Sequence, residues 1–290
     1  MLRHRLTLGP VLILTFLGVI WLDQILARKG WWPGLVLTAF LLVVGTFAGR
    51  ELSRIFKARQ ITTSRRIVVM AVWAGLLSSS FTAAELNGLS GSAVVCTTAM
   101  VVLVLSMTYY SRDRSPEGVV AASAATLLAF VYVGLMGGFA IVVHKEFGGW
   151  VLVGVVLVAK AYDIGAYFTG RLIGKHKLIP WLSPGKTWEG VAGGVVLASA
   201  VAIIAASWLA PMLGLRMAWW QAALTGAFLG AVAQAGDLLA SLLKRDAGIK
   251  DYSGALPGFG GVMDVADSPL LVAPAAYWFL KAFAAPATGS

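Results

Sequence analysis

The feature that most constrains the fold is a series of apolar stretches, each long enough to cross a lipid bilayer. A membrane-spanning helix needs about 20 predominantly apolar residues. The chain has nine such stretches, at residues 8–26, 31–48, 67–84, 92–110, 118–142, 150–169, 191–210, 218–236 and 262–283. The sequence therefore predicts an all-α, polytopic integral membrane protein with about nine transmembrane helices.

The composition supports this prediction. Of the 290 residues, 59% are hydrophobic and only 12% are charged, whereas soluble domains carry about 25% charged residues. So few charges do not cover a water-facing surface, which excludes a soluble enzyme, a disordered chain and a nucleic-acid binder. The net charge of +10 is better explained by basic loops that face anionic lipid head groups.

The distribution of basic residues predicts the orientation. With nine spans, the N-terminus and every second loop lie on one side, which carries 17 basic residues against 5 on the other. Because cytoplasmic loops are enriched in Lys and Arg, we expect the N-terminus and these loops in the cytoplasm, and the chain in the cell membrane. The first span follows Arg3 and Arg5 but has no small-residue cleavage site before Arg28, so we interpret it as an uncleaved anchor.

The two parts of the chain differ in their polar residues. Residues 1–150 hold the first five spans with simple charged loops, whereas residues 151–290 hold the last four spans and place ionisable groups in or beside them. We expect the second part to be catalytic and the whole to form one membrane domain. The lone Cys96 has no disulfide partner, and the three histidines lie on separate loops, so the sequence predicts neither disulfides nor a zinc cluster.

Lys160 and Asp163 lie inside the sixth predicted span. A charge at the centre of a membrane helix costs about 2.5–3.5 kcal/mol on insertion scales, which makes each a functional candidate. Their i, i+3 spacing places them on one helix face. Two interpretations stay open: a self-neutralising ion pair without function, or a polar cavity lined by Asp163, Tyr167 and Arg171 that opens to the cytoplasm.

The loop that follows, residues 171–190, is basic. Its segment Ser183-Pro184-Gly185-Lys186-Thr187 resembles a phosphate-holding turn, although it lacks the spacing of a Walker A loop. A basic loop that only obeys the topology rule is an equally good interpretation.

The segment 236–268 carries the strongest signal. Asp237, Ser241 and Lys244 have helical spacing and share a face, as do Asp264 and Asp267. The glycine-rich run between them can bring backbone N–H groups close to an anion. Carboxylates beside lysines suit Mg²⁺ and a polyphosphate, so the sequence favours phosphoryl or nucleotidyl transfer.

Here a resemblance to a known family becomes specific. The run Ser241-x-x-Lys244-Arg245-x4-Lys250-Asp251, followed by Pro257-Gly258-x-Gly260-Gly261-x-x-Asp264-x-x-Asp267-Ser268, resembles the signature of the phosphatidate cytidylyltransferases (CDP-diacylglycerol synthases). The segments 163–167 and 183–190 resemble two further blocks in the same order. The resemblance covers about residues 160–270. It implies that CTP and phosphatidic acid form CDP-diacylglycerol and pyrophosphate, in phospholipid biosynthesis.

The resemblance also implies roles for individual residues. Asp237 and Asp264 would hold Mg²⁺, with Asp267 alongside and Lys244 as a further catalytic group, and whether a second cation joins the Mg²⁺ is left open. The expected substrate-binding residues are Asp163, Lys186, Thr187, Ser241, Arg245, Lys250, Asp251, Gly260 and Gly261. The expected partners are CTP, phosphatidic acid, membrane lipids and, from the resemblance alone, a second copy of the chain.

Two positions depart from the family pattern. Phe259 stands where the family has a histidine, and Val265 where it has an arginine. Three alternatives therefore stay open: a divergent paralogue that acts on another lipid phosphate, a lipid-transport protein, and a non-catalytic membrane protein.

Overall fold

The computed structural model describes residues 2–81, 90–212 and 215–286. Its helices are α1 (Leu2–Arg28), α2 (Leu35–Ala58), α3 (Arg65–Ser79), α4 (Gly91–Tyr110), α5 (Val119–Ala129), α6 (Met136–Phe147), α7 (Gly149–Ile173), α8 (Trp188–Met212), α9 (Trp219–Asp246) and α10 (Val262–Phe283). A π-helical turn, η1 (Phe130–Leu135), joins α5 and α6 into one continuous segment.

The prediction of an all-α, polytopic membrane protein is confirmed, apart from four short strands in the described residues. Each predicted span overlaps a helical segment, although residues 82–84 of the third span lie outside the described residues, as do the side chains of Arg3 and Arg5. Within the described ranges, seven helical segments are long and apolar enough to cross a membrane. The other two are α3, which is short, and α10, which carries two prolines and begins with acidic residues.

Two short pairs of antiparallel strands are added to the helices in the described residues. Strand β1 (Lys177–Ile179) pairs with β2 (Ser183–Thr187), and β3 (Leu215–Arg216) pairs with β4 (Ala285–Pro286). The prediction that 183–187 forms a phosphate-holding turn is therefore wrong. The segment is an extended strand because Lys177 and Ile179 pair with Thr187 and Ser183, and the reversal of the chain falls before it, at 180–182.

The chain divides into two compact units that do not follow chain order. Unit 1 comprises Met1–Lys145 with Leu243–Ala266, and unit 2 comprises Glu146–Leu242 with Asp267–Ser290. Most of the strongest sequence signal, 243–266, thus groups with the N-terminal helices. The functional division of the chain at residue 150 stays a prediction.

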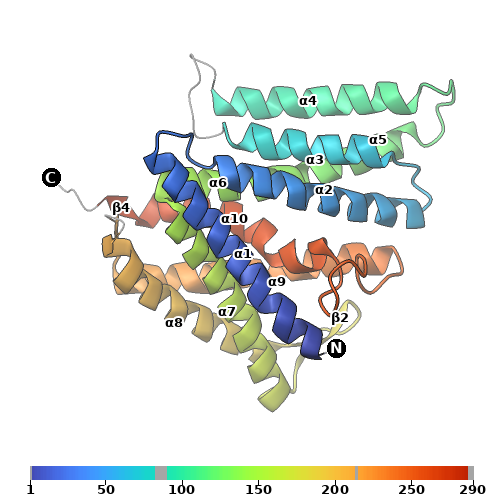
Figure 1. The fold of residues 1–290 in the computed structure, drawn as a ribbon. Coiled ribbons are helices and arrows are strands. Elements are labelled where there is room, and N and C mark those ends of the chain that lie inside the picture. Colours follow the sequence, from blue (N-terminus) through green and yellow to red (C-terminus); the bar gives the residue numbers. More distant parts are fainter. Residues whose placement is uncertain (1, 82–89, 213–214, 287–290) are drawn as a thin grey trace. The chain divides into compact units, whose positions relative to one another are not determined.

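In unit 1, the helices α2, α3, α4 and α5 lie side by side (Figure 1). Helix α3 and the turn η1 meet at two glycines: a Cβ on Gly75 would lie 2.6 Å from the backbone oxygen of Phe130, and one on Gly134 would lie 2.8 Å from that of Val72. Small residues of this kind allow close backbone approach in membrane proteins.

In unit 2, α7 and α8 pack along each other, and α9 packs on α8. A Cβ on Gly165 would lie 2.7 Å from the Gly193 oxygen, and one on Gly226 would lie 2.6 Å from the Ala198 oxygen. The ring of Tyr162, which is 1% exposed, lies against Gly194 and Gly230. These contacts fix the helices that carry the polar residues of unit 2.

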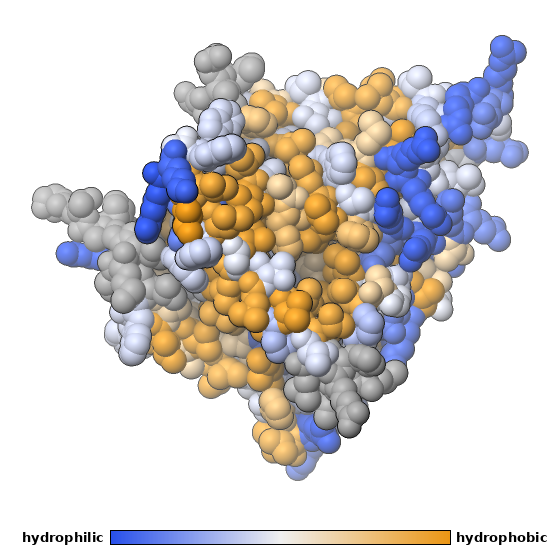
Figure 2. Space-filling model, viewed as in Figure 1, coloured by the Kyte–Doolittle hydropathy of each residue, from blue (hydrophilic) through white to orange (hydrophobic). Residues whose placement is uncertain are grey.

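The helix surfaces suit a lipid environment. Only 11% of the apolar stretch in α1, and the same share in α4, is buried, and large residues such as Leu14 and Met100 face outward. Figure 2 shows this apolar surface, with hydrophilic residues gathered at the end of unit 1 where α2 turns into α3 and α4 turns into α5. The two loops at that end are both predicted to be cytoplasmic.

Candidate functional site

Unit 2 contains a polar cluster built by α7, β2 and α9. Lys186 Nζ lies 2.8 Å from Asp237 Oδ2, and Lys160 Nζ donates to Asp163 Oδ2 at 3.1 Å. Asp163 is also within electrostatic range of Asp237 and Lys186. The structure therefore brings together Asp163, Lys186 and Asp237, which the sequence placed in three separate motifs.

Tyr167 and Arg171, predicted to line a cavity with Asp163, are both exposed. Arg171 Nη1 donates to the Tyr167 hydroxyl at 3.0 Å, and Tyr167 is 58% exposed. The polar cavity thus stays a prediction, while the cluster around Asp163 is a structural observation.

Thr187 caps a helix. Its side chain is buried, and its Oγ1 accepts a hydrogen bond from Gly190 N at 3.1 Å, at the start of α8. This is the N-cap geometry that threonine favours. The capping role explains the presence of Thr187, and its predicted contact with substrate stays untested.

Asp267 and Ser241 also belong to unit 2. Asp267 is 7% exposed, and its Oδ1 accepts from Ser268 N at 2.7 Å. A Cβ on Gly236 would lie 2.8 Å from the Asp267 backbone oxygen, so α9 approaches α10 closely beside Asp237. Ser241 is half-buried on α9.

Unit 1 contains the second group of candidate residues, centred on Asp264 at the start of α10. Lys244 Nζ donates to Asp264 Oδ1 at 2.8 Å. The other oxygen, Oδ2, accepts from Tyr252 N at 2.9 Å and from Gly261 N at 2.8 Å. One carboxylate thus ties α9 to the turn formed by residues 251–261, called here the glycine turn.

Both the backbone conformation and the available space require a glycine at position 260. Gly260 has a φ of +96°, which side chains rarely adopt, and a Cβ there would lie 2.6 Å from Asp264 Oδ2. The turn closes through Leu256 N to Gly260 O at 2.8 Å and Gly260 N to Leu256 O at 2.9 Å. Its conformation therefore depends on glycine and places backbone N–H groups next to Asp264.

Three further candidates of unit 1 are exposed: Arg245, Lys250 and Asp251. The neighbouring Asp246 pairs with Arg59 at 2.9 Å. That pair places the end of α9 at the same end of unit 1 as the basic loop between α2 and α3. The exposed cations are available to an anionic ligand there.

Sequence reasoning missed Glu51. The predicted second span stops at 48, but α2 continues to Ala58 because Leu52, Ile55 and Phe56 pack inward. Glu51 is 3% exposed and accepts hydrogen bonds from Ser253 Oγ, Val262 N and Met263 N. A signal was present, since Glu51 is the only acidic residue between Asp23 and Glu85.

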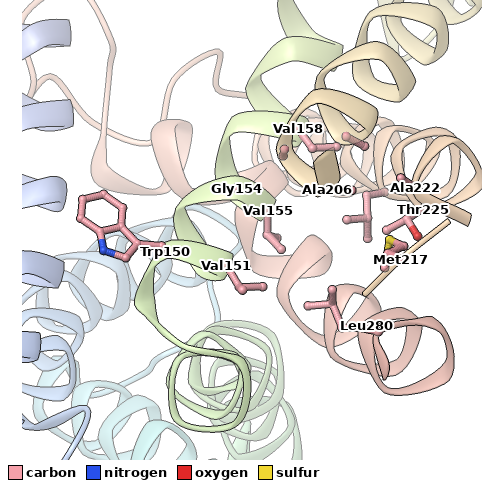
Figure 3. Close-up of a pocket in the computed structure, with 14 residues that line it drawn as sticks. Trp150, Val151, Gly154, Val155, Val158, Ala206, Met217, Ala222, Thr225 and Leu280 are labelled. Atoms are coloured by element: carbon pink, nitrogen blue, oxygen red, sulfur yellow. The ribbon is translucent and has the colours of Figure 1, made fainter. Parts of the chain in front are cut away.

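An apolar cavity of about 90 Å³ lies elsewhere in unit 2 (Figure 3). Its lining includes Val155, Val158 and Leu280 and contains no charged side chain, and the Thr225 hydroxyl already donates to Gln221 O. Along α7 the buried Tyr162, which donates to Gln234 Oε1 at 3.2 Å, comes between this lining and Asp163. The cavity therefore offers no charged side chain to a phosphate.

The donor set bears on the predicted metal. Among the described residues, no three His, Cys, Asp or Glu side chains are close enough to hold an ion together. Mg²⁺ is commonly held by one or two carboxylates with substrate phosphates and waters, so isolated aspartates beside lysines fit Mg²⁺ carried by a nucleotide. They do not fit an ion held by protein groups alone.

Comparison with known proteins agrees with the family resemblance. The model of the cytidylyltransferase family matches residues 3–283. A phosphatidate cytidylyltransferase of Bacillus subtilis is 30% identical over 97% of this chain and 98% of its own length. Those of Mycobacterium bovis and Helicobacter pylori are 38% and 36% identical, over 66% and 67% of this chain and 62% and 67% of their own lengths.

Proposed function

Because this chain belongs to the cytidylyltransferase family, we propose that it transfers the cytidylyl group of CTP to phosphatidic acid, giving CDP-diacylglycerol and pyrophosphate. The family match runs through almost the whole chain, including both groups of candidate residues. The observation that carries the proposal is the Lys244–Asp264 pair at the glycine turn, because it combines a cation, a carboxylate and backbone donors in one place.

The reaction exchanges one phosphoryl bond for another. A phosphate oxygen of phosphatidic acid forms a bond to the α-phosphorus of CTP, and the bond from that phosphorus to the bridging oxygen breaks, so that pyrophosphate leaves with the electron pair. A phosphate monoester has a second pKa of about 6 and is already largely ionised near pH 7. The reaction therefore needs no general base, and the protein positions the groups and neutralises charge.

Residues of unit 1 would bind the triphosphate. Lys244, with Arg245 and Lys250 nearby in the chain, supplies the positive charge that a departing pyrophosphate requires. The N–H groups of Tyr252 and Gly261 donate to Asp264, so the glycine turn supports this site by holding that carboxylate in place. Through its three hydrogen bonds, Asp264 holds Lys244 of α9 next to the glycine turn.

Residues of unit 2 would bind the lipid phosphate. Lys186 is enclosed, with 16% of its side chain exposed, and its partner Asp237 holds it at 2.8 Å. Asp163 adds a second carboxylate to the cluster, which fixes the position of the lysines. Asp163 and Asp237 lie on the apolar helices α7 and α9, and Lys186 lies on strand β2, directly before α8.

The carboxylates of Asp237 and Asp264 would hold Mg²⁺, with Asp267 alongside. Bound Mg²⁺ would neutralise phosphate charge and orient the triphosphate. This assignment follows from the sequence signature, and the sharing of one ion by the two aspartates is a prediction, as are a second cation and a homodimer. We further propose that the N-terminus and the loops with these residues face the cytoplasm, where CTP is available.

The proposal is tested by pyrophosphate release from CTP by the purified protein, with phosphatidic acid and Mg²⁺. Release should depend on all three. Asp264→Asn and Asp237→Asn should each lower the rate by more than the about 10–100-fold that loss of an outer-shell partner costs. The exposed Asp113→Asn is the matched control and should keep the rate. A wild-type protein without release, or an unaffected aspartate variant, would contradict the proposal.

A further inference from the structure

Glu51 is a buried carboxylate that the proposed mechanism does not use. It lies on α2, and all its partners are in unit 1. Ser253 Oγ donates to Oε1 at 2.6 Å, Val262 N donates to Oε1 at 3.0 Å, and Met263 N donates to Oε2 at 2.9 Å. Each of these partners is a neutral donor, so Glu51 acts by accepting hydrogen bonds.

Two of the donors are the first backbone N–H groups of α10. The first N–H groups of a helix have no partner within it, and a Ser, Thr, Asp or Asn before the helix usually binds them. Gly261 occupies that position and has no side chain. Glu51 therefore supplies from α2 the cap that α10 lacks, and its negative charge suits the positive end of the helix dipole.

Asp264 holds the same turn from within α10. Its Oδ2 accepts from Gly261 N at 2.8 Å, as the third residue of a helix does in a capping box. The orientation of Asp264 thus depends on a first turn that Glu51 fixes.

The carboxylate of Glu51 lies so close to Gly261 that it leaves no space for a side chain there. A Cβ at this position would lie 2.6 Å from both carboxylate oxygens of Glu51. Unlike Gly260, Gly261 does not have a positive φ. The second glycine of the signature pair is therefore explained by contact with a distant residue of α2.

We propose that Glu51 is a positioning residue of the nucleotide site: it fixes the first turn of α10 and, through that turn, the carboxylate of Asp264 and the N–H groups of the glycine turn. This inference rests on the proposed function of Asp264. It extends the site to the N-terminal half of the chain, which the sequence treated as simple spans.

The first test compares Glu51→Gln with Glu117→Gln, the same change at an exposed glutamate of unit 1. Glu51→Gln should raise the KM for CTP and lower kcat/KM for CTP by about tenfold or more, as loss of charge-assisted hydrogen bonds does, and leave the KM for phosphatidic acid unchanged. Glu117→Gln should behave as wild type. A lower yield of active protein with unchanged KM values would mean a purely structural role and would overturn the proposal.

The second test uses Gly261→Ala. In the wild-type background the new methyl group meets Glu51, so kcat/KM for CTP should fall. In Glu51→Ala the space is free, so the same substitution should add little further loss. Losses that multiply independently would show that the two residues are not coupled, which would overturn the proposal.

A third measurement does not depend on activity. Hydrogen exchange of the amides in 261–266 should accelerate in Glu51→Ala relative to wild type, while exchange in α4 stays the same. If wild-type protein releases no pyrophosphate from CTP, the proposed function fails, but this measurement still tests the anchoring of α10. Unchanged exchange in 261–266 would overturn it.

Discussion

The lysines of the candidate site differ in how enclosed they are. Lys186 and Lys244 pair with the two predicted metal ligands, and their side chains are 16% and 13% exposed. Lys160 pairs with Asp163, and its side chain is 41% exposed. An enclosed ion pair is screened less by water than an exposed one. The structure thus separates the enclosed Lys186 and Lys244 from the more exposed Lys160, whereas the sequence showed only that all three are lysines near acidic residues.

This difference predicts unequal effects of the same substitution within unit 2. Lys186→Met should lower kcat/KM for phosphatidic acid by about 10–100-fold, since a hydrogen bond to a charged group contributes about 1.5–3 kcal/mol. Lys160→Met should lower it by less than about tenfold. Steady-state kinetics over a series of phosphatidic acid concentrations in mixed micelles checks this, and equal losses would contradict the ranking.

Phe259 and Val265 are the two departures from the family pattern. The Phe259 ring lies beside α1, since its Cζ is 3.6 Å from where a Cβ of Gly9 would be. Val265 is half-buried and directly follows Asp264. Neither side chain carries a charge for the triphosphate, so Lys244 and its neighbours must supply it.

Restoring the family residues together, Phe259→His with Val265→Arg, should therefore raise the rate on CTP and phosphatidic acid. One added charge-assisted hydrogen bond of about 1.5 kcal/mol corresponds to about tenfold in rate. Initial rates of pyrophosphate release from the double variant and wild type, at saturating Mg²⁺, measure the change. A rate at or below wild type would indicate that the site compensates for both residues or prefers another lipid phosphate.

At the scale of helices, the N-termini of two helices are each capped by a carboxylate from another helix. Glu51 caps α10, and Asp23 on α1 caps α2, where it accepts from Gly34 N at 2.8 Å and Val36 N at 2.7 Å. Glycine precedes each helix, so a carboxylate from another helix takes the place of a side-chain cap. Such caps are invisible to local sequence rules, which search for Ser, Thr, Asp or Asn next to the helix.

Asp23 has a further partner that makes its loss costly. His144 Nε2 lies 2.6 Å from Asp23 Oδ2, and both side chains are almost fully buried. The sequence placed this histidine in a loop, but it belongs to α6. Asp23→Ala would leave buried N–H groups and an imidazole without their acceptor.

We expect Asp23→Ala to destabilise unit 1 by about 3–5 kcal/mol, as the loss of one partner of a buried pair does. The exposed Asp113→Ala should change stability by less than about 1 kcal/mol. Thermal unfolding in detergent, followed by tryptophan fluorescence, compares the variants. A midpoint for Asp23→Ala that equals that of Asp113→Ala would contradict the capping role.

At the scale of the whole chain, sequence alone predicted the helices well and their ends poorly. The apolar stretches fix where helices cross the membrane, because lipid leaves no other partner for backbone groups. Helices α2 and α9 nevertheless continue to Ala58 and Asp246, well beyond the predicted spans. Their ends are stabilised by tertiary contacts, such as Arg59 with Asp246, which hydropathy does not register.

In the candidate site, too, the sequence did not reveal contacts between distant segments. The sequence placed Lys244, the glycine turn and Asp264 in one segment, 236–268, and the structure brings them into contact. It did not identify Glu51, because that residue reaches the turn from a segment some two hundred positions away. Local motifs thus reveal the residues that meet within one segment, and long-range hydrogen bonds require coordinates.

The predicted orientation in the membrane concerns the loops along the whole chain. In unit 1 the loops at 59–64 and 111–118 lie at one end (Figure 1), whereas the turn between α1 and α2 carries Lys29 and lies at the other. The positive-inside rule assigns the first end to the cytoplasm.

With Cys96 replaced by serine, a single cysteine at Asp113 should be shielded from a membrane-impermeant maleimide in intact cells and labelled after lysis. One at Lys29 should be labelled in both. The reverse pattern would turn the basic loops outward, away from CTP, and would contradict both the orientation and the proposed reaction.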